Sequence, residues 1–151
     1  IVQLFESCAS LFTRSEYLEF ALPYQQRIFT ALRDNGTTIM FARILEDTLS
    51  LKEVTAAGAD IVSLSTTRPI GEIRKEIGSS AVVQGNLDNQ LLAQGPVEDI
   101  LKATRACLDE GECRGHIFNL NHGILPQTPH DHITSVVDYV RAYNHTPSHF
   151  D

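Results

Sequence analysis

The residues best suited to chemistry follow short apolar segments of the sequence. Ser7, Arg43, Asn86 and His122 each stand two or three positions after such a segment. An imidazole can transfer protons near neutral pH, and a guanidinium group can pair with carboxylates in a forked geometry. Hydroxyl and amide groups add hydrogen bonds. The set is small, polar and cationic, and it predicts a cleft that binds an acidic ligand.

His122 is the strongest single candidate for a catalytic role. It is flanked by Asn121 and Gly123, two residue types that tolerate a positive φ, so we expect a sharp turn after the preceding segment. A histidine on such a turn is well placed to donate a hydrogen bond or to transfer a proton. The alternative is a histidine that only caps the loop.

The other candidates have weaker signals. Ser7 has no His or Asp beside it in the sequence to activate it as a nucleophile, so we expect a hydrogen-bonding role, or a turn contact with the backbone. Arg43 and Arg68 could bind substrate carboxylates, or each could be a solvated surface residue. Asn86 could contact a ligand or form an Asx turn.

Metal and disulfide chemistry have little support in the sequence. His130 and His132 are two positions apart, which does not place them on one helix face, and there is no Cys/His cluster of zinc-site spacing. Cys8, Cys107 and Cys113 are odd in number and form no C-x-x-C pair, which argues against a disulfide framework and favours a reducing compartment. We expect no metal site.

Composition and hydropathy argue against two classes of partner, nucleic acids and membranes. The chain has 151 residues, 42% of them hydrophobic, and a net charge of −7. A nucleic-acid-binding surface would be basic, and no apolar run reaches the length of a membrane span. The sequence opens at Ile1, inside an apolar run, and from this we expect that an N-terminal part of the protein precedes it.

The elements that must position the candidates alternate regularly. The short apolar segments are rich in β-branched and aromatic residues and have turn residues nearby, which is typical of buried parallel strands. The predicted strands are Val2–Phe5, Thr38–Phe41, Ile61–Leu64, Ala81–Val83 and His116–Leu120.

Helices are predicted between these strands. Capping-box patterns begin at Thr13 and Ser50, and the first of these helices should run toward Arg33 with a break at Pro23. Three further helices have a proline at their start. These prolines are Pro69, Pro96 and Pro129.

Strict alternation of strand and helix predicts an α/β fold with a parallel sheet. No G-x-G-x-x-G follows the first strand, so a dinucleotide-binding sheet has no support. An open five-unit sheet would leave buried-type strands unpaired at its edges. We therefore expect about five β-α units forming the C-terminal part of a (β/α)8 TIM barrel over residues 1–143, with a loose tail at 144–151.

Three groups of motifs, in register, resemble the uroporphyrinogen decarboxylase family. They are QLFES with FALPY (residues 3–7 and 20–24), QGNLD (84–88) and FNLNHGI (118–124). The resemblance covers roughly residues 1–143 and implies a barrel enzyme. Members of this family are carboxy-lyases that remove four acetate carboxyl groups from uroporphyrinogen III, giving coproporphyrinogen III and CO2 without a cofactor.

The resemblance also implies roles for individual residues. His122 matches a substrate-contacting histidine, and Ser7 matches a substrate-contacting serine. The family's aspartate that grips the pyrrole NH groups, its arginine pair and its tyrosine have no counterpart here, so we expect this chain to be inactive by itself. The resemblance implies a homodimer for the complete protein, either cytoplasmic or in a plastid.

The sequence departs from the usual family pattern at several positions. Asn121 replaces Gly, and Asn89 replaces Pro. Cys8 stands where Trp or His is frequent, and Ser65 with Thr66 stands where an Asp-Trp pair is common. These departures bear on substrate selectivity. Since Asn can adopt a left-handed turn as Gly does, we expect the placement of His122 to be kept.

Two other functions stay open. A cobalamin-linked methyltransferase would use the same type of barrel with a zinc-bound thiol in a His-x-Cys element, but here the corresponding strand end reads Phe41-Ala42-Arg43. A non-catalytic half barrel could instead pair with another chain through its open strand edges.

Overall fold

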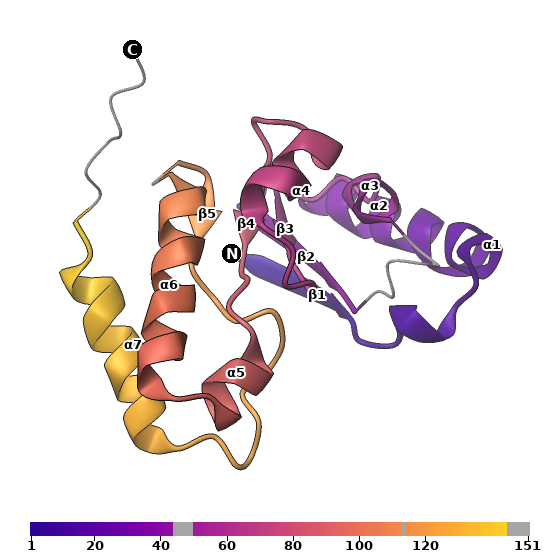
Figure 1. The fold of residues 1–151 in the computed structure, drawn as a ribbon. Helices are drawn as coiled ribbons and strands as arrows, with labels where there is room; N and C mark the ends of the chain where they lie inside the picture. Colours follow the sequence, from indigo (N-terminus) through magenta and orange to yellow (C-terminus); the bar gives the residue numbers. More distant parts are fainter. Residues whose placement is uncertain (44–49, 113, 145–151) are drawn as a thin grey trace.

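The computed structural model describes residues 1–43, 50–112 and 114–144 (Figure 1). Within them, five parallel strands form one sheet in the order β1-β2-β3-β4-β5. The strands are β1 (Val2–Glu6), β2 (Thr38–Ala42), β3 (Ile61–Ser63), β4 (Val82–Gln84) and β5 (His116–Ile117).

All five predicted strands are confirmed, but the last one is shorter than expected. Strand β5 ends at Ile117 because the chain after β4 turns at Gly85, which has a φ of 132°. Pairing resumes at a single bridge between Leu87 and Leu120. The shortened strand therefore leads into a loop that still lies against the segment following β4.

Helices connect the strands. The α-helices are α1 (Arg14–Glu16), α2 (Leu22–Leu32), α3 (Leu51–Thr55), α4 (Ile70–Ile77), α5 (Asn89–Gln94), α6 (Val97–Gly111) and α7 (His130–Ala142). A 3-10 turn, η1 (Ala9–Leu11), and a π-helical turn, η2 (Tyr17–Ala21), flank α1. In the part of the chain that the structure describes, none of the helices has the length and apolar character needed to cross a membrane.

The predicted helix starts are confirmed. Thr13 and Ser50 each form a capping box, with Glu16 and Glu53 respectively. The predicted break at Pro23 takes the form of η2, where the N–H of Leu22 bonds back five residues. Pro23 has no N–H to continue the α-helical ladder, so the backbone widens just before it.

The sequential strand order confirms the predicted barrel arrangement and contradicts an open doubly wound sheet. An open doubly wound sheet reverses its strand order and carries helices on both faces. Here the order is sequential, so right-handed crossovers place every connecting helix on one side. This is the arrangement of part of a (β/α)8 barrel, and its other face corresponds to the barrel interior.

Strand register defines the two faces of the sheet. One row of paired residues packs beneath the helices, and we call it the covered row: Leu4, Met40, Val62, Val83 and His116. The next row points the opposite way, since successive side chains alternate along a strand. We call it the open row: Phe5, Phe41, Ser63, Gln84 and Ile117.

Two apolar clusters hold the fold together. The first joins the covered row to the helices α2, α3 and α4, through side chains such as Phe29, Val54 and Ile73. The second joins α5, α6 and α7 around Leu87 and Ile100. Figure 1 shows α6 and α7 packed side by side at one end of the sheet.

Arg74 connects the two clusters. This buried arginine on α4 donates to backbone carbonyls at the end of α6 and just beyond it, including those of Arg114 (2.6 Å) and Gly115 (3.1 Å). In return, Glu110 of α6 accepts from the N–H of Ile70 at the start of α4 (2.6 Å). Each charged group meets the helix end of opposite polarity, which stabilises the α4–α6 junction.

Candidate functional site

A cleft of about 320 Å³ opens at the carboxyl ends of the strands, on the open face of the sheet. Reactive groups of barrel enzymes lie at this end. Its lining is mostly polar and aromatic: Gln3, Phe5, Ser7, Phe41, Ser63, Gln84, Asn119, Leu120, His122 and Gly123.

Ser7 and His122 line the same cleft although they follow opposite edges of the sheet. Ser7 comes after β1 and His122 after β5, with three strands between them. A flat sheet would hold these two loops far apart, whereas a coiled sheet brings its edges toward one another. The sheet therefore supplies the curvature that a shared site requires.

The imidazole of His122 is oriented by two contacts. Its ring meets the ring of Phe41 edge to face, with centroids 5.6 Å apart and planes at 81°. Its Nδ1 accepts the N–H of Gly123 at 2.8 Å. A neutral imidazole that accepts at Nδ1 carries its proton on Nε2, so His122 can offer an N–H to a ligand in the cleft.

The predicted left-handed turn around His122 is wrong. Neither Asn121 nor Gly123 has a positive φ. The Asn121 N–H instead donates to the carbonyl of Leu87 at 2.8 Å, and its side chain accepts from the N–H of Asn89 at 3.0 Å. These tertiary bonds hold the loop in ordinary backbone geometry, so no left-handed residue is needed.

Arg43 and Asn86 do not line this cleft. Arg43 is exposed beyond β2, and its backbone N–H donates to the carbonyl of Glu6 at 3.1 Å. Asn86 is buried, and its amide nitrogen donates to the carbonyls of Thr66 (2.9 Å) and Arg68 (2.7 Å). It thereby ties the loop after β4 to the loop after β3.

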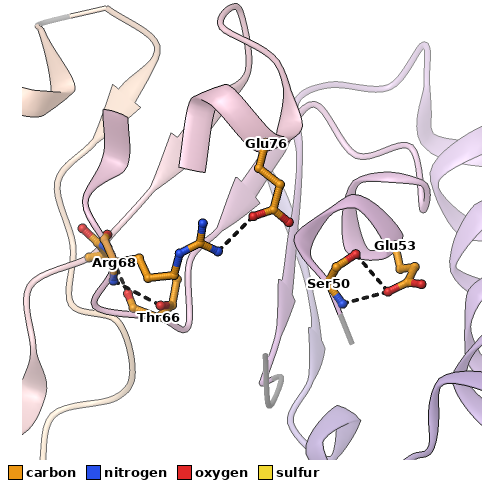
Figure 2. A network of polar contacts seen from close by, with 6 residues as sticks. Ser50, Glu53, Thr66, Arg68 and Glu76 are labelled. Carbon is orange, nitrogen blue, oxygen red and sulfur yellow. Dashed lines mark hydrogen bonds and ion pairs between the residues drawn. The ribbon is translucent and has the colours of Figure 1, made fainter. Parts of the chain in front are cut away.

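Arg68 is engaged by an acidic neighbour. Its guanidinium pairs with Glu76 at 2.9 Å, and its backbone N–H donates to the hydroxyl of Thr66 at 3.1 Å. Figure 2 shows both contacts. The same view contains the capping box of Ser50 and Glu53. Arg68 is therefore directed to Glu76, and it is not part of the cleft lining.

Gln84 and Ser63 form part of the cleft wall and were not among the predicted site residues. The amide nitrogen of Gln84 donates to the hydroxyl of Ser63 at 3.1 Å, and both side chains are buried. The Ser63 hydroxyl still has a proton to donate, and the Gln84 carbonyl can accept. A polar residue inside the apolar β3 segment was the available signal.

Burial sets the protonation of two groups that do not line the cleft, His116 and Cys107. It lowers the pKa of His116, reinforced by the nearby positive charge of Arg74, although the contact of Nε2 with the carbonyl of Gly85 (2.5 Å) opposes the shift. Burial raises the pKa of the Cys107 thiol. Both groups are therefore held in their neutral forms. Within the described residues, no group of His, Cys, Asp or Glu side chains could hold a metal ion.

Known proteins resemble this chain over nearly its whole length. The model of the family described as "Uroporphyrinogen decarboxylase (URO-D)" matches residues 1–143. The uroporphyrinogen decarboxylase of Myxococcus xanthus is 38% identical over 144 residues, covering 95% of this chain and 40% of the relative. That of Syntrophotalea carbinolica is 36% identical over 141 residues, covering 92% of this chain and 40% of the relative.

A solved structure shares the fold. A methyltransferase from Methanosarcina mazei superposes with a TM-score of 0.75 at 20% identity, covering 91% of this chain and 41% of the other. At this identity the likeness concerns the fold alone. The chain spans about 40% of the length of the curated relatives named above. With the family model matched over residues 1–143, the chain belongs to the uroporphyrinogen decarboxylase family.

Proposed function

We propose that this chain forms the C-terminal part of a uroporphyrinogen decarboxylase, supplying one wall of the cleft that binds uroporphyrinogen. The observation that carries the proposal is the shared cleft of Ser7 and His122, which lie in two of the family-like motifs and follow opposite edges of the sheet. As a carboxy-lyase, the complete protein would release coproporphyrinogen and CO2. By itself, this chain would not turn over substrate.

The chemistry requires proton transfer and charge recognition. Protonation of a pyrrole carbon makes the ring an electron sink, so the bond to the carboxylate breaks and CO2 leaves. The electron pair of that bond returns the ring to neutrality, and the exposed methylene carbon takes up a proton to become a methyl group. The ring carbon then releases the proton that it had gained, which restores the pyrrole. An N–H at Nε2 of His122 can donate to a substrate carboxylate and assist these transfers. The hydroxyl of Ser7 adds a second hydrogen bond.

The remaining residues have supporting roles in this proposal. Arg43, exposed beyond the end of β2, would attract the acidic substrate as it approaches the cleft. Asn86 would act indirectly, by holding the loops after β3 and β4 together. We also propose a cofactor-free, homodimeric complete protein that binds no nucleic acid or membrane, located in the cytoplasm or in a plastid.

The test is the reaction of the complete protein that contains this chain. The complete reading frame is expressed and assayed with uroporphyrinogen under anaerobic conditions, together with His122→Asn and Ser7→Ala variants. We expect His122→Asn to lower kcat/KM about 100-fold or more, as for loss of a proton-transfer group. We expect Ser7→Ala to lower it about tenfold, as for one lost hydrogen bond.

His130→Asn is the matched control, because His130 is an exposed histidine at the start of α7 that does not line the cleft. Its activity should equal that of the unaltered protein. A complete protein that folds but forms no coproporphyrinogen would contradict the proposal. An active, monodisperse 151-residue chain would contradict the claim that this part is inactive alone.

A further inference from the structure

We propose that Asn89 is a positioning residue that fixes His122 in the cleft by binding the residues on both sides of it. The catalytic consequence of this placement rests on the proposed function. The placement itself is a property of the fold, and it can be measured without turnover.

Asn89 contacts both chain neighbours of His122. Its backbone N–H donates to Oδ1 of Asn121 at 3.0 Å, and its side-chain amide donates to the carbonyl of Gly123 at 2.8 Å. Asn89 is only 7% exposed, so water competes little for either bond. One buried residue thus holds both residues that flank His122.

The segment before Asn89 adds two backbone bonds to the same loop. The N–H of Leu87 donates to the carbonyl of Asn119 at 3.0 Å, and the N–H of Asn121 donates to the carbonyl of Leu87 at 2.8 Å. The loop is therefore attached at Asn119, Asn121 and Gly123. The His122 side chain takes no part in these attachments and faces Phe41 in the cleft.

Helix α5, which begins at Asn89, is itself held in place by hydrogen bonds and packing. Asn89 is its first residue, and the N–H groups of a first turn have no partner inside the helix. Asn121 accepts from the first of them, and Asp88 accepts from the second, that of Gln90. The helix is packed by Leu92, whose carbonyl meets Nδ1 of His132 on α7 at 2.8 Å. Motion of the loop would therefore require rearrangement of α5 or loss of these bonds.

The two partners are also two of the positions where this sequence departs from the usual family pattern. A proline at position 89 would have no N–H to donate, and a glycine at position 121 would have no side chain to accept. The bond between Asn89 and Asn121 therefore requires both departures together. Because either single change already breaks this bond, we expect the two changes combined to cost less than the sum of their separate effects.

The test compares variants of the complete protein. Asn89→Ala removes the bond to Gly123, Asn121→Ala removes the acceptor for the Asn89 N–H, and Asn121→Asp keeps an oxygen acceptor at that position. Asn89→Pro and Asn121→Gly are made singly and together; each single change removes one partner of the shared bond, and the double variant removes both. Proline is tolerated at a first helical position.

We expect each alanine variant to lower kcat about tenfold with little change in KM, the effect of losing one buried hydrogen bond that aligns a reacting group. Asn121→Asp should stay within about threefold of the unaltered protein, since its acceptor oxygen is kept. The double variant Asn89→Pro with Asn121→Gly should be less impaired than the product of the effects of its two single changes.

A second readout is independent of turnover. Acylation of His122 by diethylpyrocarbonate is followed by mass spectrometry, with the exposed His130 as internal reference. In Asn89→Ala the His122 rate should change several-fold relative to His130, and in Asn121→Asp it should not. Equal His122 rates in Asn89→Ala and in the unaltered protein would overturn the proposal, whether or not the protein is a decarboxylase. Independent, additive effects at positions 89 and 121 would overturn the coupling.

Discussion

The two faces of the sheet are built for different purposes. On the covered face, Met40 and Val83 are fully buried beneath the helices, and apolar packing sets the stability of the fold. On the open face, the neighbouring row runs from aromatic Phe41 to polar Ser63 and Gln84 and lines the cleft. The same strands thus devote alternate residues to the apolar core and to the wall of the cleft.

The largest expected difference between the two faces is in the free energy of unfolding that is lost when a side chain is replaced by alanine. Met40→Ala should lower the free energy of unfolding by about 2–5 kcal/mol, because it opens a cavity at a side chain that is 0% exposed. Phe5→Ala removes a larger side chain that is 63% exposed and should cost less than about 1 kcal/mol. Chemical denaturation monitored by circular dichroism measures both. Equal losses for the two variants would erase the proposed difference between the faces.

An intermediate effect is expected within the open row. Gln84→Ala leaves the buried Ser63 hydroxyl without its partner and should cost about 1–2 kcal/mol of stability. The Gln84→Ala/Ser63→Ala double variant should cost less than the sum of the single variants, because both partners are then absent. Thermal unfolding of the four proteins completes the cycle. Strict additivity would show that the 3.1 Å contact does not contribute to stability.

The smallest effect concerns His116, the polar member of the covered row. Its pKa is lowered in the folded protein by burial and by Arg74, so the unfolded chain binds more protons below its own pKa, near 6.5. The stability associated with neutral His116 is present above that pKa and is lost as the pH falls toward the folded value.

Unfolding measured between pH 7 and pH 5 should therefore show a decline in stability that is reduced in a His116→Gln variant. Glutamine stays neutral across this range and can still donate to the carbonyl of Gly85, the group that His116 meets in the unaltered protein. His130→Gln, at an exposed position, is the control. An identical pH profile for His116→Gln and the unaltered protein would rule out this role.

Helix starts could be predicted from the sequence because their causes are local. A capping box needs only residues within four positions, as at Thr13 and Ser50. Helix α5, by contrast, was not predicted. It has six residues, which is too short for a hydrophobic period, and it is held by Asn121 and by packing against α7. Such a helix depends on partners that are distant in the sequence.

Only part of the candidate site could be predicted from the sequence, because some of its residues are brought together by contacts between distant segments. The rule that reactive groups follow parallel strands identified Ser7 and His122, and the structure places both at one cleft. It also pointed to Arg43 and Asn86, which lie outside the cleft lining, because the rule does not say which way a loop side chain turns. Gln84 and Ser63 were missed because only strand register shows that they face each other.

The sequence by itself determined the alternation of strands and helices, the capped helix starts and the motifs of the family, since each depends on residues that are close along the chain. The tertiary structure alone decided the sequential strand order, the division into covered and open rows, and the attachment of the His122 loop to Asn89. These features depend on hydrogen bonds and packing between distant segments. These interactions stabilise the protein only after the sheet has formed and coiled.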